Sequence, residues 1–114
     1  MLQSFSFRKG SLAGLDMVFD CRFLKNPNWV SNLKGLNGTD DEVKDYLSKD
    51  KSWPPFKKNI IQMLATTIPA FEREGKSYLS IGLGCTGGQH RSVFVAEQLH
   101  KPLLDIKDLS LIHI

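Results

Sequence analysis

The chain contains two cysteines, Cys21 and Cys85, and no uninterrupted apolar run of the roughly 20 residues that a membrane-spanning helix needs. Two cysteines provide no framework of disulfides. Residues 1–5 also lack the basic-then-apolar order of a secretory signal. We therefore expect a cytoplasmic protein with reduced cysteines and no membrane partner.

Other absences narrow the class of protein further. The cysteines and histidines show none of the paired short spacings of structural zinc sites, so we expect no metal. Internal repeats and low-complexity segments are also missing. The composition, 41% hydrophobic and 24% charged, is that of an ordinary globular protein, and 114 residues suffice for one core. The net charge of +3 permits contact with nucleic acid or phosphorylated ligands without requiring it.

Four segments have strand patterns. Residues 2–7 alternate apolar and polar side chains, which is typical of a strand with one buried face. Residues 17–19 and 78–83 are short apolar runs, and residues 108–114 resemble a short last strand. These segments predict a small sheet.

Three helices are predicted between and after these strands. Thr39 and Glu42 have the spacing of a capping box, which predicts a short helix. Residues 54–71 carry apolar side chains at three- and four-residue steps, with Pro69 expected to kink or end this helix. A third helix is expected to end at about His100. Strands alternating with helices predict a single-domain α/β fold with a mostly parallel sheet and flanking helices.

The glycine-rich segment 84–92 follows one predicted strand and precedes a predicted helix. Glycines allow the backbone N–H groups to turn inward, and the N-terminus of the helix adds a partial positive charge. Arg91 adds a full positive charge. The segment therefore predicts a binding site for phosphate or another small dianion.

A second interpretation of this segment is catalytic. Five residues separate Cys85 from Arg91, as in phosphatases in which a cysteine thiolate attacks phosphorus, and Ser92 follows as a hydroxyl that stabilises the thiolate. Gly84, however, stands where that pattern usually has a histidine, and Asp20 is the candidate general acid. The alternative for Cys85 is a small buried residue at the end of a strand.

The pair Asp20 and Arg22, and separately His90, each have two interpretations. Asp20 and Arg22 lie two residues apart, so they point the same way if the strand is regular. They form either a plain ion pair or an acceptor for sugar hydroxyls beside a phosphate clamp. His90 either adds charge to the anion site by titrating near neutral pH or is a structural residue of the first helical turn.

Six segments, in order along the chain, resemble the C-terminal domain of the RapZ family of RNase adapter proteins. They are residues 4–8, 16–24, 26–29, 36–40, 73–79 and 81–93. The resemblance implies part of a sugar-phosphate kinase fold over residues 1–114. It also implies a missing N-terminal P-loop domain, because no Walker A pattern occurs here. ATP or GTP is expected only in that domain.

The resemblance further implies a regulatory, non-catalytic domain. Such domains bind small regulatory RNA, present it to an endoribonuclease, sense glucosamine-6-phosphate and form homo-oligomers. A purely structural oligomerisation module is the remaining alternative. Carried over by position, the ligand pocket comprises Arg8, Asp20, Arg22, Cys85, Thr86, Gly87, Gly88, His90 and Arg91.

Three features depart from the family pattern, although Arg8 fits the pocket as a basic residue in place of a lysine. The Walker A pattern is absent, and Asn28 stands where many members have a histidine. Some members end in a strongly basic tail that contacts RNA, whereas residues 101–114 are largely apolar and contain no arginine. Phosphate contacts supply most of the sequence-independent affinity for nucleic acid. The sequence therefore leaves open whether this chain alone binds RNA.

Overall fold

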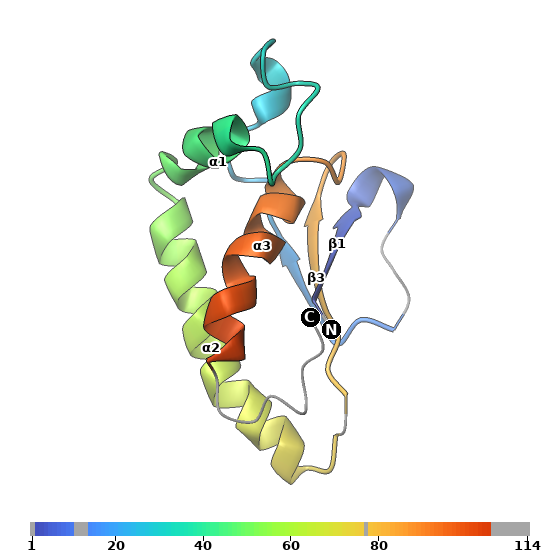
Figure 1. Cartoon of the computed structure of the whole chain (residues 1–114). Helices are drawn as coiled ribbons and strands as arrows, with labels where there is room; N and C mark the ends of the chain where they lie inside the picture. Colours follow the sequence, from blue (N-terminus) through green and yellow to red (C-terminus); the bar gives the residue numbers. More distant parts are fainter. Residues whose placement is uncertain (1, 11–13, 77, 106–114) are drawn as a thin grey trace.

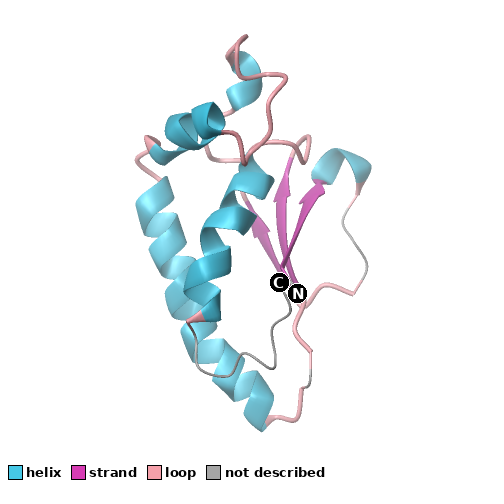
Figure 2. Ribbon diagram, viewed as in Figure 1, coloured by secondary structure: helices cyan, strands magenta, loops and turns pink. Residues whose placement is uncertain are grey.

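Three parallel strands, β1 (Leu2–Ser6), β2 (Met17–Asp20) and β3 (Ile81–Cys85), form the sheet, with β3 in the middle. The structure, a computed structural model, describes residues 2–10, 14–76 and 78–105. All three arrows point to the same end of the sheet, where the connecting loops gather (Figure 2). The predicted α/β fold with a parallel sheet is confirmed.

Three helices accompany the sheet: α1 (Asp41–Ser48), α2 (Trp53–Arg73) and α3 (Arg91–Leu104). Two short 3-10 helices, η1 (Phe7–Lys9) and η2 (Pro27–Trp29), lie beyond the ends of β1 and β2. In Figure 1, α3 lies in front of the sheet and the long α2 runs beside it. Contacts of α3 with β1, β3 and α2 make it the element that joins the sheet to the other helices.

The core lies between the sheet and these helices. The residues that α2 buries recur at steps of seven and four, which places them on one helical face: Trp53, Ile60, Leu64 and Ile68. They meet Ile81 and Leu83 of β3 and Phe94 of α3 in one cluster. Burial of each large side chain contributes about 1.5–3 kcal/mol, so this cluster is the main source of stability.

On the opposite face of the sheet, side chains pack directly on the central strand. Gly82 and Gly84 of the central strand lie under Leu15, Phe5 and Phe7. A Cβ at Gly84 would lie 2.5 Å from the ring of Phe7 and 2.6 Å from that of Phe5. The glycines are therefore required by the close approach of these rings.

The predicted capping box does not form. Asp40 is the N-cap of α1 and makes no side-chain capping bond. Thr39 instead donates its N–H and its hydroxyl to Oδ1 of Asn37, at 2.8 and 2.5 Å. Asp40 Oδ2 accepts the N–H of Asn37 at 2.8 Å. A local turn around Asn37 thus takes the groups that the capping box would have used.

Other helix and strand boundaries differ from the prediction. Pro69 does not end α2, which continues to Arg73. Helix α3 runs past His100 to Leu104, and β3 extends to Cys85 because the ladder with β1 continues that far. The strand predicted over residues 108–114 lies outside the described residues. No helix within the described residues combines the length and apolarity that crossing a membrane requires.

Candidate anion-binding site

A polar cavity of about 190 Å³ opens at the carboxyl end of the sheet. Parallel α/β sheets commonly bind ligands at this edge, because the loops that follow the strands converge there. One water molecule occupies about 30 Å³ of liquid, so the cavity has room for a small anion. Its lining residues are Arg8, Asn26, Asn28, Cys85, Thr86, Gly87, Gln89, His90 and Arg91.

The loop after β3 is fixed to β1. Gly88 has φ +70°, a left-handed conformation that favours glycine, and a Cβ there would lie 3.0 Å from Cβ of Ser6. The Ser6 hydroxyl donates to the carbonyl of Thr86 at 2.7 Å, and the N–H of Arg8 donates to the same carbonyl at 3.3 Å. The loop is therefore held in shape before any ligand arrives.

Arg91, the first residue of α3, is 5% exposed and lies in the cavity wall. Its Nη1 donates to the carbonyls of Arg22 and Leu24, at 2.5 and 3.1 Å, and its Nη2 donates to Oγ1 of Thr86 at 3.3 Å. A guanidinium has five N–H donors. The Nε–H and one Nη2–H therefore have no acceptor among the described residues, and they are suited to an anion.

Cys85 lies at the base of the loop, with Sγ 3.2 Å from Oγ and 3.4 Å from N of Ser92. Burial raises the pKa of the thiol, but hydrogen bonds from Ser92 and from the N–H of Gly88, and the charge of Arg91, outweigh burial and lower the pKa below its ordinary value. In contrast, burial raises the pKa of Cys21 to about 12. The cavity thus stabilises negative charge.

Gln89 and His90 connect the cavity to the segment before α1. The Gln89 amide donates to the carbonyls of Lys34 and Leu36, at 3.0 and 2.6 Å. The buried ring of His90 places Nε2 3.2 Å from the carbonyl of Leu33. This contact agrees with the structural interpretation of His90 and still leaves the residue in the lining of the cavity.

Asp20 and Arg22 lie outside the cavity lining. They form a two-pronged ion pair at 2.7 Å, with both side chains about half exposed, and the guanidinium of Arg22 lies 4.0 Å above the ring of Phe7. The hydrogen bond from Arg22 lowers the pKa of Asp20. This geometry favours the plain ion pair of the two interpretations.

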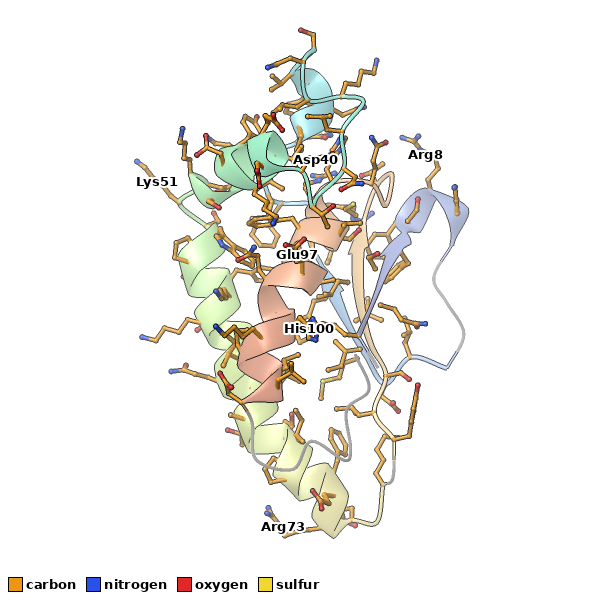
Figure 3. All side chains as sticks on the ribbon, in the orientation of Figure 1. Arg8, Asp40, Lys51, Arg73, Glu97 and His100 are labelled. Carbon is orange, nitrogen blue, oxygen red and sulfur yellow. The ribbon has the colours of Figure 1, made fainter. Side chains whose placement is uncertain are left out.

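The structure brings most of the predicted pocket together. Six of the predicted residues line the cavity: Arg8, Cys85, Thr86, Gly87, His90 and Arg91. Gly88 lies outside the lining and contributes the left-handed turn of the loop. Arg8 projects from η1 beyond the end of β1 (Figure 3). Their role in binding stays a prediction.

Sequence reasoning missed Asn26 and Gln89, and it named Asn28 only as a departure from the family. Asn26 Oδ1 accepts the N–H of Asn28 at 3.0 Å, which holds both residues at the cavity. The only local signal was the turn composition of residues 26–29. No three His, Cys, Asp or Glu side chains that could hold a metal come together in the described part of the chain.

These features define a small α/β domain with a polar cavity at the carboxyl edge of a parallel sheet. The family model described as the RapZ C-terminal domain matches residues 1–113. The chain therefore belongs to the RapZ C-terminal domain family, in which the domain has a regulatory role.

Curated relatives carry the name nucleotide-binding protein, and their names give no enzyme activity. The chain is 51% identical over 104 residues to one from Cereibacter sphaeroides, which covers 91% of this chain and 34% of the relative. It is 52% identical over 103 residues to one from Dinoroseobacter shibae, covering 90% and 34%. The chain thus spans about a third of the length of these relatives.

Proposed function

We propose that this domain is a regulatory module whose cavity binds the phosphate of an amino-sugar phosphate, glucosamine-6-phosphate, or a backbone phosphate of RNA. The observation that carries the proposal is Arg91, a buried cation with two N–H donors that have no acceptor among the described residues. The first N–H groups of α3 and the side chain of Arg8 add to the positive electrostatic potential of the cavity.

The sugar of such a ligand would lie toward η2. Asn26 and Asn28 line the cavity, and side-chain amides have the donors and acceptors that hydroxyl and amino groups require. Asp20, which we also expected to accept from those groups, would first have to leave its ion pair with Arg22. We therefore assign the sugar contacts to the two asparagines before Asp20.

The family resemblance supports the remaining parts of the proposal. They are binding of small regulatory RNA, its presentation to an endoribonuclease, self-association and a cytoplasmic location. Residues 101–114 contain two lysines and no arginine, so we assign the RNA contact to the cavity with Arg8 and Arg91. Nucleotide binding, for which the relatives are named, is assigned to a separate domain.

Replacement of Arg8 by alanine tests the phosphate site. Removal of one charge-assisted hydrogen bond should weaken the binding of glucosamine-6-phosphate, measured by calorimetry, by about 1.5–3 kcal/mol. Lys9→Ala is the matched control, because Lys9 is the next residue of η1, has the same charge and does not line the cavity. Equal affinity of Arg8→Ala and the wild type would contradict the assignment.

Arg91→Ala is a second variant with a different expectation. It should lose binding and also lower stability, because Nη1 holds the carbonyls of Arg22 and Leu24. If the wild type binds neither glucosamine-6-phosphate nor RNA and light scattering shows a stable oligomer, the alternative of a structural oligomerisation module is correct instead.

A further inference from the structure

The cavity holds a sulfur nucleophile beside groups that bind phosphate. Cys85 ends the central strand and lines the same cavity as Arg91, Thr86 and Gly87. A phosphoryl group on the spare donors of Arg91 would share this space of about 190 Å³ with Sγ. Binding would therefore bring phosphorus and sulfur together.

The environment of Sγ is that of a thiolate rather than of a packed apolar thiol. Ser92 approaches it with a hydroxyl at 3.2 Å and an N–H at 3.4 Å. Gly88 adds a second N–H, and Arg91 adds a full charge. Thiolates, not thiols, are nucleophiles, and neighbouring donors and cations raise the thiolate fraction at neutral pH. Cys21 lacks such a shell: it is fully buried, has one backbone bond from Gly84, and its thiol donates to the carbonyl of Phe19 at 3.8 Å.

Among the described residues, the lining of the cavity supplies no general acid for a leaving group. None of its lining residues is a carboxylic acid, and the ring of His90 is engaged with the carbonyl of Leu33. Asp20, the candidate acid from the sequence, is paired with Arg22. Alkoxides, the leaving groups of sugar phosphates, need a general acid, whereas phenolates and carboxylates leave as stable anions. Sugar phosphates would therefore bind without being cleaved.

We propose that Cys85 accepts a phosphoryl group from activated phosphates, namely aryl or acyl phosphates, that enter the regulatory cavity. The thiolate forms an S–P bond while the P–O bond to the leaving group breaks, and the electron pair stays on the phenolate or carboxylate. Arg91 and the loop N–H groups hold the phosphoryl oxygens. Water then attacks phosphorus, the S–P bond breaks, and inorganic phosphate leaves with the protons of that water. This activity rests on the proposed phosphate site and goes beyond regulation.

The test uses the full chain with p-nitrophenyl phosphate and follows nitrophenolate by absorbance, with intact mass after acid quench to find one phosphoryl group on Cys85. Cys85→Ser and Cys85→Ala should each lower turnover at least about 100-fold. Cys21→Ala, the matched control, should retain the wild-type rate. Ser92→Ala should move the pH–rate profile to higher pH, which a merely structural role of Ser92 would not do. Glucosamine-6-phosphate should release no inorganic phosphate and should inhibit.

Two results would overturn the proposal. The first is wild-type protein that binds inorganic phosphate in calorimetry but releases no nitrophenolate, which leaves the proposed phosphate site intact. The second is turnover that persists in a folded Cys85→Ser or Cys85→Ala variant, with folding verified by circular dichroism. Absence of both phosphate binding and turnover in the wild type would instead reject the phosphate site together with the activity that rests on it.

Discussion

Two cysteines on neighbouring strands have opposite chemistry. Cys21 follows β2 and is fully buried, so burial raises the pKa of its thiol to about 12. Cys85 ends β3 beside the donors of Ser92, and its pKa lies below the ordinary value. The same residue type thus acts as packing in one place and as part of the cavity in the other, because hydrogen bonds and the charge of Arg91 outweigh burial at Cys85, whereas burial dominates at Cys21.

The raised pKa of Cys21 predicts how stability depends on pH. In the unfolded chain the thiol loses its proton near its ordinary value of 9.0, whereas the folded chain retains it until about 12. The stabilisation is therefore fully present below pH 9 and is lost as pH rises toward 12, with a slope of up to about 1.4 kcal/mol per pH unit. Urea denaturation at several pH values should show a smaller slope in Cys21→Ala; an identical slope would contradict the prediction.

Single residues of the site were predictable to different extents. The glycines with Arg91 form a pattern whose chemistry needs no tertiary information, so this part of the pocket was predicted. Asp20 and Arg22 were placed in the pocket by family position, and their spacing left an ion pair and a sugar contact as alternatives, between which the side-chain rotamers decide. Gln89 was missed because its partners, the carbonyls before α1, are distant in sequence.

At the scale of elements, the start of α3 is docked on the segment that precedes α1. Gly38 donates its N–H to the carbonyl of Gln89 at 3.0 Å. A Cβ at Gly38 would overlap the carbonyl oxygen of His90 and the backbone nitrogen of Phe94. These are backbone atoms of the site and its helix, so they cannot move independently.

Gly38→Ala should therefore destabilise the protein by about 1–3 kcal/mol and weaken binding of glucosamine-6-phosphate. Gly35→Ala is the matched control, because no atom lies within 4 Å of a Cβ placed there. Urea denaturation gives the first quantity and calorimetry the second. Equal stability of the Gly38→Ala and Gly35→Ala proteins would show that the close approach is absent in solution.

Helix α2 contains an internal proline that local rules disfavour. Pro69 lies four residues before the end of the helix at Arg73, and it lacks the N–H that an interior position would donate. Pro69→Ala should raise the free energy of unfolding by about 1–2 kcal/mol, after allowance for the more flexible unfolded chain. Pro54 lies in the first turn of the helix, where no N–H donor is needed, so Pro54→Ala should change the free energy of unfolding by only about a few tenths of a kcal/mol. A Pro69→Ala protein no more stable than the wild type would contradict this in chemical denaturation.

The apolar periodicity predicted that α2 exists, but local patterns did not predict where the helices end. Four buried residues on one face required the helix, whatever the local cost of Pro69. The capping box at Thr39 and Glu42 was wrong because Asn37 offered Thr39 a nearer acceptor. Packing thus determines where a helix exists, and short-range competition among polar side chains determines where it begins.

At the scale of the whole molecule, the mild charge of +3 sets a limit on electrostatic binding. The cavity supplies two arginines, Arg8 and Arg91. Neutralising two phosphates of a single strand gives a slope of about −1.4 in a plot of log affinity against log salt concentration. RNA binding measured by fluorescence anisotropy should have this shallow slope, and glucosamine-6-phosphate should compete with the RNA. A much steeper slope without competition would place the RNA on another surface.

The order of the strands was not predictable from local patterns, and it has a consequence for how the chain folds. Strands β1 and β2 each pair with β3, so both of these ladders join the first 20 residues to residues 81–85. The bond from Ser6 to Thr86 spans 80 positions. Closing loops of this length precedes any gain from strand pairing, and such topologies fold slowly. During synthesis, the first two strands remain without a partner until the loop that forms the cavity leaves the ribosome, so sheet and binding site are completed together.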